Sequence, residues 1–386
     1  MEAFEIDIVE TKYCTNGAKI KVIGVGGGGG NMINHMIREG VKDIDLIVAN
    51  TDGQALENSL APYKIKLGVN TTGGQGAGMI PEKGREAALE SFEELRSILK
   101  GADMVFISAG LGGGTGTGAA PIIAQVAKEI GALTVSIVTS PFKFEGKKRT
   151  ALAKEGLEEL KRESDSIIVI PNEKLLSIVE KNLGIKESFR MVDDILAQAV
   201  GGISNVIISH GENDINLDFA DIKTVMNHRG LALMGTGKSI GKNAAYDAAK
   251  IAIESPLLDN ISIDGATGIL VHFYIHPDYP LMEISEAMEI IEENADEHAY
   301  VIFGTTTDSS LSIDEVKITV IATGFEDKTN TLLKTSEKQP AQSLFNSNSS
   351  NNINTLRNAN KIVVGGYNTD DDDIYQVPTF LRKQMD

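Results

Sequence analysis

A seven-residue segment of glycine and threonine, residues 112–118, constrains the fold of this chain more than any other stretch. An apolar run at residues 104–107 precedes it, and a helical pattern at 119–130 follows it. A strand, a glycine turn and a helix in that order form an anion cradle, because glycine lets backbone N–H groups approach closely and a helix N-terminus carries partial positive charge. Thr115 and Thr117 add hydroxyl donors. A flexible linker is a poor alternative, since the segment lies between two strongly patterned elements.

Two further glycine clusters lie at similar points of the chain. Residues 26–30 are consecutive glycines between an alternating strand pattern and a helical pattern at 32–39. Residues 73–78 hold four glycines before a helical pattern at 81–100, whose first residues, Pro81 and Glu82, suit a helix start. The chain therefore carries three glycine clusters, each just before a predicted helix: the first at residues 26–30, the second at residues 112–118 and the third at residues 73–78.

The first cluster also matches a known fingerprint. Gly24, Gly26 and Gly29 fit GxGxxG, which is a weak signal of a dinucleotide-binding fold when it stands alone. That fold also needs an acidic residue at the end of the next strand, for the ribose. The next predicted strand ends instead in Asn-Thr-Asp, and Asp52 fits a helix N-cap as well as a ligand.

Strand and helix patterns alternate through the first half of the chain. We expect strands at 18–25, 46–49, 104–107, 133–138 and 167–170, and helices at 32–39, 81–100, 119–130 and 147–162. This alternation predicts an α/β fold with a doubly wound, mostly parallel sheet. Ligands bind such sheets at the carboxyl ends of the strands. The three glycine clusters and the loops at 139–145 and 171–172 are therefore expected to converge on one edge.

A long helix is predicted at residues 187–209, and a second α/β domain follows it. The helix has a broad apolar face, which indicates burial between two domains, and close packing would explain Gly201 and Gly202 in its middle. Beyond it we expect helices near 221–227, 243–255 and 284–294 and strands at 230–234, 268–275, 300–305 and 316–322. Residues 237–239 (Gly-Lys-Ser) do not complete a P-loop, because Ala232 stands where its first glycine belongs, so we expect a turn there.

Composition excludes several classes of protein. A formal net charge of −18 argues against a nucleic-acid surface or an anionic membrane surface. One cysteine, Cys14, excludes an internal disulfide and fits a reducing compartment. The start of the chain lacks a signal-peptide pattern, and no run reaches the roughly 18 apolar residues of a spanning helix. The six histidines show no ligand spacing. We therefore expect a cytoplasmic protein without direct membrane insertion.

The two ends of the chain differ from its middle. Residues 1–17 are polar and predicted to form a flexible arm, and residues 326–373 have the composition of a disordered linker. Residues 374–386 regain an apolar and basic pattern, which is typical of a docking peptide for partner proteins. The alternative is a disordered terminus with chance apolar residues. The docking residues would be Ile374, Val377, Pro378, Phe380, Leu381, Arg382 and Lys383.

An acidic loop follows the long helix. Asp218 and Asp221 stand three residues apart and share one side of a starting helical turn. One of them could orient or deprotonate a water, as phosphoryl transfer requires. Helix capping by Asp218 explains the same spacing equally well, so the sequence leaves both interpretations open.

Four segments together resemble the FtsZ family of bacterial tubulin-like cell-division GTPases. They are residues 112–118 (GGGTGTG), 26–31, 141–149 (PFKFEGKKR) and 216–221 (NLDFAD). The resemblance covers about residues 18–325, and residues 377–384 (VPTFLRKQ) are similar to the partner-binding tail of that family. It implies a nucleotide-binding domain at 18–186, a central helix at 187–211, a smaller α/β domain at 212–325, a linker and a tail peptide.

The resemblance also implies roles for residues of this chain. The phosphates of GTP would contact Gly27, Gly28, Gly29, Gly30, Asn31, Gly114, Thr115 and Gly116, with Ala77 and Gly78 near the terminal one. Glu145 and Arg149 would contact the ribose side, and Asn172, Phe189 and Asp193 would hold guanine. Asn216, Asp218 and Asp221 would form the catalytic loop, and Mg²⁺ would lie on the phosphates. Two departures from the family pattern are Ile80, where Asn is usual, and Ser140, where Lys is frequent.

A protein of this family would assemble with copies of itself. The implied product is a head-to-tail homopolymer that builds the cell-division ring at mid-cell, near the inner membrane. The tail peptide would bind cell-division proteins and membrane tethers.

Helix length supports hydrolysis between subunits. Residues 193 and 211 are about 27 Å apart along a helix, so a chain that holds guanine at Asp193 would not bring Asp218 to the same terminal phosphate. A head-to-tail neighbour could bring it there.

Two rival interpretations are a Rossmann-type oxidoreductase, which leaves residues 112–118 unexplained, and a nucleotide-binding structural protein without catalysis.

Overall fold

The computed structural model describes residues 17–41, 43–178, 184–208, 215, 217–227, 230–255, 263 and 265–325. Within these ranges lies one compact unit, and the predicted arm, linker and tail fall outside them, apart from Gly17.

Six parallel strands form the first part of the sheet. They are β1 (Ile20–Val25), β2 (Asp45–Asn50), β3 (Tyr63–Lys66), β4 (Met104–Gly110), β5 (Leu133–Ser140) and β6 (Ser166–Pro171). Their order is β3-β2-β1-β4-β5-β6, with Val22 of β1 paired to Phe106 of β4. This is the Rossmann order, and the chain reverses direction across the sheet between β1 and β4. Ligands of such sheets bind at that point, beyond the carboxyl ends of the strands.

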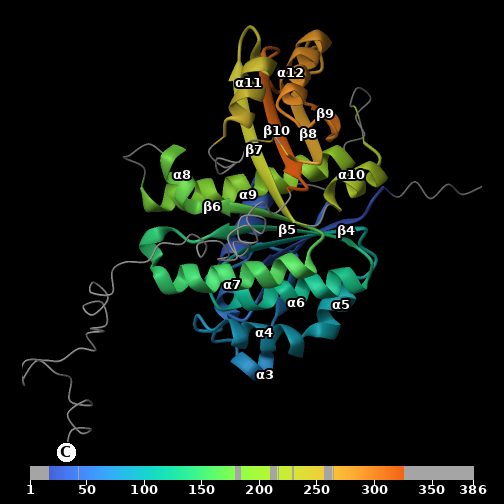
Figure 1. Cartoon of the computed structure of the whole chain (residues 1–386). Helices are drawn as coiled ribbons and strands as arrows, with labels where there is room; N and C mark the ends of the chain where they lie inside the picture. Colours follow the sequence, from blue (N-terminus) through green and yellow to red (C-terminus); the bar gives the residue numbers. More distant parts are fainter. Residues whose placement is uncertain are drawn as a thin grey trace, which may run out of the picture. The chain divides into compact units, whose positions relative to one another are not determined.

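Helices cover both faces of these strands. They are α1 (Gly26–Arg38), α2 (Gly53–Glu57), α3 (Val69–Thr72), α4 (Pro81–Glu90), α5 (Phe92–Leu99), α6 (Thr115–Glu129), α7 (Lys147–Glu163) and α8 (Asn172–Ile178), with a 3₁₀ turn η1 (Lys143–Glu145). Figure 1 shows α4 to α7 below the strands and α9 (Ile185–Ile208) above them. Two hydrophobic cores result, one on each face, so the predicted doubly wound sheet is confirmed.

The long helix α9 packs between these six strands and the last four strands of the sheet. Its buried residues Leu196 and Ile203 share one core with Val135 of β5 and with Leu270 and Ile321 of the last four strands. The predicted burial of this helix is therefore confirmed.

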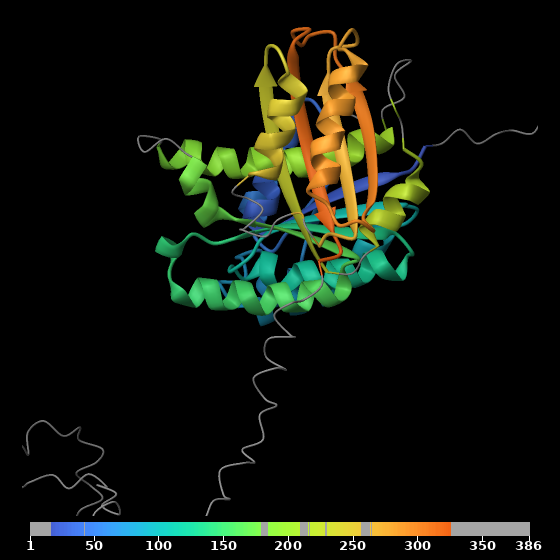
Figure 2. The ribbon, with the colours of Figure 1, turned by 45° about the horizontal axis from the view of Figure 1, so that its top comes forward.

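The last four strands, which we call the second sheet, have the order β7-β10-β8-β9. They continue the first six strands in one ten-stranded sheet, because β7 pairs in parallel with β6 at Ile167 and Ile168. Its strands are β7 (Leu231–Ile240), β8 (Gly268–Ile275), β9 (Tyr300–Thr307) and β10 (Glu315–Thr323), and its helices are α10 (Phe219–Met226), α11 (Ala244–Ile253) and α12 (Leu281–Glu293). β10 is antiparallel to β7 and β8, whereas β8 and β9 are parallel. Figure 2 shows α11 and α12 along one face of these strands, where they close a third core.

Several predicted element bounds are wrong at glycine residues. α1 begins at Gly26 and α6 at Thr115, so helix starts lie inside the clusters that we expected to be turns. A Cβ on Gly29 would lie 2.2 Å from the carbonyl oxygen of Ser108. These glycines therefore permit close packing of a helix on a strand, in addition to any turn.

Two further corrections concern the predicted helix 81–100 and the predicted turn at 237–239. The helix is interrupted at Ser91, whose hydroxyl accepts a hydrogen bond from Gly68 N–H at 3.1 Å. Residues 237–239 continue strand β7. A Cβ on Gly237 would lie 1.9 Å from Ala248 O, so this glycine lets α11 pack directly on the strand.

The expectation of no spanning-length apolar segment also needs correction. In the part of the chain that the structure describes, the stretch Glu187–Ile208 is long and apolar enough to cross a membrane by length and composition. However, 56% of its most apolar window is buried inside the chain. Burial explains this apolar composition, because the helix packs between the first six strands and the last four.

Candidate functional site

The glycine clusters meet at the carboxyl edge of the parallel strands. A Cβ on Gly26 would lie 3.0 Å from the backbone nitrogen of Gly116. A Cβ on Gly114 would lie 2.8 Å from the Cβ of Ala77, in the third cluster. The predicted convergence of the three clusters is therefore confirmed, and they flank the point between β1 and β4 where the strand order reverses.

Two helix N-termini in this cradle carry no side-chain cap. α1 starts after Val25 and α6 after Gly114, and neither first turn contains an acidic residue or a capping hydrogen bond from a side chain. The first N–H groups of an α-helix have no partner within the helix, and they carry the positive end of its dipole. Around Gly27 and Gly113 there is open space, since a Cβ at either position would meet nothing within 4 Å. The cradle is therefore built to accept an anion.

The third cluster is tied to the end of β2. Gly53 N–H donates to Gly74 O at 3.0 Å, and Gly76 N–H donates to Thr51 O at 3.1 Å. Asp52 accepts from the backbone of Gln54 at 2.9 Å, so it is the N-cap of α2 and not the ribose acid of a Rossmann fold. The third cluster thereby gains a fixed position beside the first two.

Sequence reasoning missed one residue of this region. The hydroxyl of Thr51 lies 2.6 Å from that of Thr115, at the start of α6, and Thr51 is fully buried. Its position directly after the apolar strand β2 was the available signal, because residues there point to the ligand edge.

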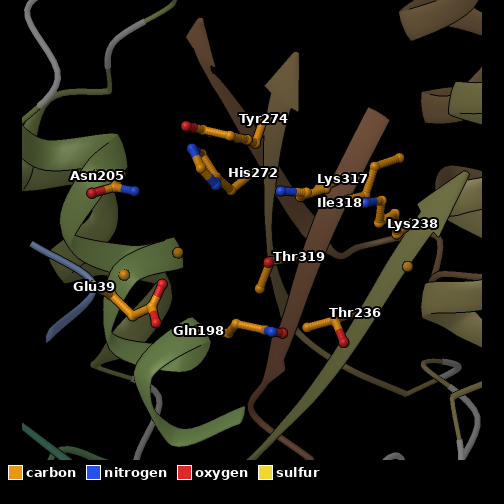
Figure 3. A pocket seen from close by; sticks show the side chains of 13 residues that line it. Glu39, Gln198, Asn205, Thr236, Lys238, His272, Tyr274, Lys317, Ile318 and Thr319 are labelled. Carbon is orange, nitrogen blue, oxygen red and sulfur yellow. The ribbon is translucent and has the colours of Figure 1, made fainter. Parts of the chain in front are cut away.

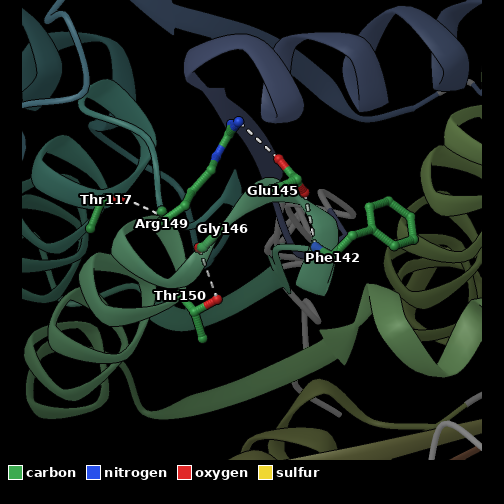
Figure 4. Close-up of polar contacts among 7 residues, drawn as sticks. Thr117, Phe142, Glu145, Gly146, Arg149 and Thr150 are labelled. Atoms are coloured by element: carbon green, nitrogen blue, oxygen red, sulfur yellow. Dashed lines mark hydrogen bonds and ion pairs between the residues drawn. The ribbon is translucent and has the colours of Figure 1, made fainter.

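Glu145 and Arg149 form an ion pair beside the second cluster (Figure 4). Arg149 Nη1 lies 2.8 Å from Glu145 Oε2, and Glu145 Oε1 accepts from Phe142 N–H at 2.9 Å. A Cβ on Gly112 would lie 2.7 Å from Arg149 Cγ, so the pair borders residues 112–118. The Nε atom of Arg149 is buried without a hydrogen-bond partner in the described part of the chain.

Three residues predicted to hold a base come from two elements near the same loop. Asn172 begins α8 and is buried, and its Oδ1 atom has no partner among the described residues. Phe189 on α9 is 42% exposed and makes an edge-to-face contact with Phe142, with 5.6 Å between ring centroids. Asp193 lies one turn further along α9. An orphaned buried acceptor and an exposed aromatic ring fit a planar, hydrogen-bonding ligand.

Asp193 has an unusual environment. Burial raises the pKa of its carboxyl to about 7, and the neighbouring charge of Asp194 adds to this rise, whereas Arg38 opposes it. Perturbed carboxyl groups of this kind are frequent at functional sites.

The acidic loop lies at the other end of α9. Figure 1 shows α8 and α10 at opposite ends of this helix, which has 24 residues and is therefore about 36 Å long. Ile215 N–H donates to Thr305 Oγ1 at 2.8 Å, which fixes the loop on β9. The structure therefore does not bring Asp218 and Asp221 to the glycine clusters of the same chain.

The structure tests one of the two interpretations of Asp218, helix capping, while its catalytic role stays a prediction. This residue occupies the N-cap position of α10, but its side chain makes no capping hydrogen bond and is exposed. Asp221 lies in the first turn. Capping by the Asp218 carboxylate is therefore absent, and this carboxylate is available to another group. Asn216 and the tail residues 374–386 lie outside the described residues.

A separate cavity of about 590 Å³ lies between α9 and the second sheet (Figure 3). Figure 3 shows Gln198 and Asn205 on α9 facing Thr319, Lys317 and Tyr274 on the strands. None of the residues predicted to bind nucleotide lines it. The predicted site is instead the open cradle at the strand ends.

Comparisons with known proteins agree with this geometry. The model for the GTPase domain of the Tubulin/FtsZ family matches residues 19–180, and the model for the C-terminal domain of the FtsZ family matches residues 230–326. The cell division protein FtsZ of Helicobacter pylori strain J99 is 51% identical over 315 residues, which are 81% of each chain. That of Pseudomonas aeruginosa is 47% identical over 386 residues, covering 96% of this chain and 97% of the relative.

A solved structure has the same fold. The empty FtsZ dimer of M. jannaschii superposes with a TM-score of 0.75 at 46% identity, covering 80% of this chain and 88% of that one. The sheet order, the uncapped cradle and these matches define a tubulin-like GTPase. Within that class the chain belongs to the FtsZ family, as the four sequence segments had indicated.

Proposed function

We propose that the uncapped cradle binds the phosphates of GTP. Gly27 to Gly30 and Asn31 at the start of α1, with Gly114, Thr115 and Gly116 at the start of α6, would supply backbone and hydroxyl donors. Ala77 and Gly78 would lie near the terminal phosphate. The observation that carries this proposal is the meeting of two uncapped helix N-termini at the point where the strand order reverses.

The base and ribose would occupy the adjoining surface. Phe189 would stack on guanine, Asn172 Oδ1 would accept a hydrogen bond from it, and the Asp193 carboxylate would accept from its N1–H and 2-amino groups. Glu145 and Arg149 would contact the ribose side. Their ion pair is already held by the backbone N–H of Phe142, so this surface is largely preformed.

Magnesium would be bound through the nucleotide. The described residues hold no cluster of three or more His, Cys, Asp or Glu that could bind a metal by themselves. Mg²⁺ held with the phosphates beside the glycine clusters would neutralise charge that develops during phosphoryl transfer.

Hydrolysis would need a second subunit. Asp218 and Asp221, with Asn216, would orient or deprotonate the attacking water on the nucleotide of the next subunit in a head-to-tail filament. The separation of the acidic loop from the cradle by the length of α9 favours this arrangement. Relatives of this chain are named cell division proteins, and one solved relative is a dimer. We therefore assign this chain a filament that builds the division ring at mid-cell, in the cytoplasm near the inner membrane.

The domain boundaries and the tail form part of the same proposal. Residues 18–186 would bind nucleotide, 187–211 would form the central helix, and 212–325 would carry the acidic loop to the neighbour. Residues 326–373 would act as a tether. The peptide 374–386 would bind cell-division proteins and membrane tethers, which would attach the filament to the membrane indirectly.

Substitution of the exposed acid tests this function. Asp218→Ala should bind GTP with unchanged affinity, because Asp218 lies far from the cradle of its own chain. Its turnover should fall by about 10²- to 10⁴-fold, the usual contribution of a general base. Phosphate release and nucleotide binding are measured on the same preparation. Loss of GTP binding in this variant would contradict the assignment, and so would full turnover.

A further inference from the structure

A polar contact between a buried histidine and a partly exposed aspartate joins the helix of the first glycine cluster to the helix of the proposed base site. His35 lies on α1 and is 7% exposed, and its Nε2 atom is 2.6 Å from Oδ1 of Asp194 on α9. The neighbours of His35 on α1 that face the core, Met32, Ile33 and Met36, are fully buried apolar residues. A buried polar side chain among apolar ones is costly unless it is paired. The pair is therefore a specific link between α1 and α9.

The partner of His35 stands directly beside the residue assigned to guanine. Asp194 follows Asp193 in α9, and the charge of Asp194 contributes to the raised pKa of Asp193. Arg38, one turn after His35 on α1, acts on Asp193 in the opposite direction. The end of α1 thus contacts this turn of α9 through His35 and contributes to the charge around it through Arg38.

We infer that His35 is a positioning residue for guanine recognition: by holding Asp194, it fixes the rotation of α9 that presents Asp193 to the base. This inference rests on the proposed function, since it requires guanine at Asp193. A helix rotation about its axis moves a side chain at its surface much further than its backbone, and hydrogen bonds weaken steeply with misalignment. Because α1 begins at the phosphate cradle, one rigid helix would then set the geometry of both the phosphate and the base contacts.

The test separates base recognition from general stability. Dissociation constants for GDP and for IDP, which lacks the 2-amino group, are measured by calorimetry on nucleotide-free protein. The ratio of the two constants reports the contact with Asp193. His35→Ala and Asp194→Ala should each lower the discrimination against IDP by about tenfold, the size of one hydrogen bond to a charged group. His35→Gln, which can still donate to Asp194, should retain most of it.

A double variant and a matched control complete the experiment. Combining His35→Ala with Asp194→Ala should lower the discrimination no further than either change alone, because the two residues act through one contact. The control is His272→Ala, which removes another buried histidine that contacts Thr306 at 2.9 Å on the second sheet. It should reduce stability without changing the ratio.

Each other outcome has a defined meaning. An unchanged ratio in His35→Ala and Asp194→Ala, together with a reduced ratio in Asp193→Ala, would overturn the role of His35 and leave the base assignment intact. An equal change of the GDP-to-IDP ratio in His272→Ala would also overturn it, since a general loss of stability would then explain the effect. A ratio that Asp193→Ala leaves unchanged would overturn the base assignment itself and, with it, this inference.

Discussion

At the scale of single residues, the raised pKa of Asp193 predicts that nucleotide binding depends on pH near neutrality if this residue holds guanine as proposed. The deprotonated carboxyl accepts hydrogen bonds from both donors of guanine, whereas the protonated form cannot. With a pKa of about 7, the carboxylate is the minor form below neutrality and the major form above it. The affinity for GDP should therefore rise about tenfold from about pH 6 to about pH 8, and calorimetry over this range measures it.

A variant of the same residue provides the control. Asp193→Asn cannot titrate, so its affinity for GDP should be lower and constant over this range. Its amide can donate to the 2-oxo group of xanthine, so the variant should gain affinity for XDP relative to GDP. An affinity of the unsubstituted chain that stays flat between these pH values would contradict the role of Asp193.

At the scale of elements, replacing either of the two glycines in the middle of α9 by alanine should change the stability of the chain by a different amount. A Cβ on Gly201 would meet nothing within 4 Å, whereas a Cβ on Gly202 would lie 3.1 Å from Cγ2 of Thr319 on β10. Alanine in a helix is favoured over glycine by about 1 kcal/mol. Gly201→Ala should therefore raise the free energy of unfolding by about this amount, while steric contact should cancel the gain in Gly202→Ala.

Thermal unfolding of the two variants tests the comparison. Gly201→Ala should melt about 2 °C higher than the unsubstituted chain, and Gly202→Ala at the same temperature or lower. The opposite order would show that Thr319 does not constrain the helix.

Glycine residues limited how well the helices and strands could be predicted from the sequence. Periodicity predicted α9, the parallel strands and their convergence, because these depend on the spacing of apolar residues along the chain. The predictions were wrong at the starts of α1 and α6 and at Gly237, which lies in a strand and not in a turn. Glycine occurs both in turns and where two elements pack closely, and only the neighbouring element distinguishes these two cases. The short strand β3 lacked enough residues for a pattern.

The site was predictable to a different extent. The motif segments of the sequence indicated which residues form the candidate site, whereas the positions of these residues relative to one another required the fold. Asp52 and Asp218 both had two interpretations in the sequence. Hydrogen bonds show that Asp52 caps its helix, whereas Asp218 makes no capping hydrogen bond and its catalytic role stays a prediction. Contacts between distant segments, such as Thr51 with Thr115 and His35 with Asp194, leave no local pattern for sequence reasoning to use.

At the scale of the whole molecule, the length of α9 matters for the proposed function, in which the cradle of one chain is completed by the acidic loop of another. Phe189 and Asp193, which are proposed to hold the base, lie in the first half of α9, whereas the acidic loop follows the end of this helix, which has 24 residues and is about 36 Å long. A chain with this design should be inactive alone and active in a head-to-tail contact. Mixing two inactive variants tests this directly, because each variant can lose a different half.

The two variants are Gly27→Glu and Asp218→Ala. The first places a negative side chain in open space of the cradle, so it should repel phosphate without disturbing the fold. The second keeps the cradle and lacks the acid. Each alone should show little GTP turnover, but their mixture should recover activity, because the intact loop of the Gly27→Glu chain reaches the nucleotide of an Asp218→Ala neighbour. Random stacking in an equal mixture gives about a quarter of the contacts this productive arrangement, so recovery to roughly that fraction is expected.

Mixing Asp218→Ala with Asp221→Ala serves as the control, since neither variant carries a complete loop. Absence of recovery in the first mixture, with both chains folded and still able to assemble, would place the whole site within one chain and would require a water-positioning group near the glycine clusters.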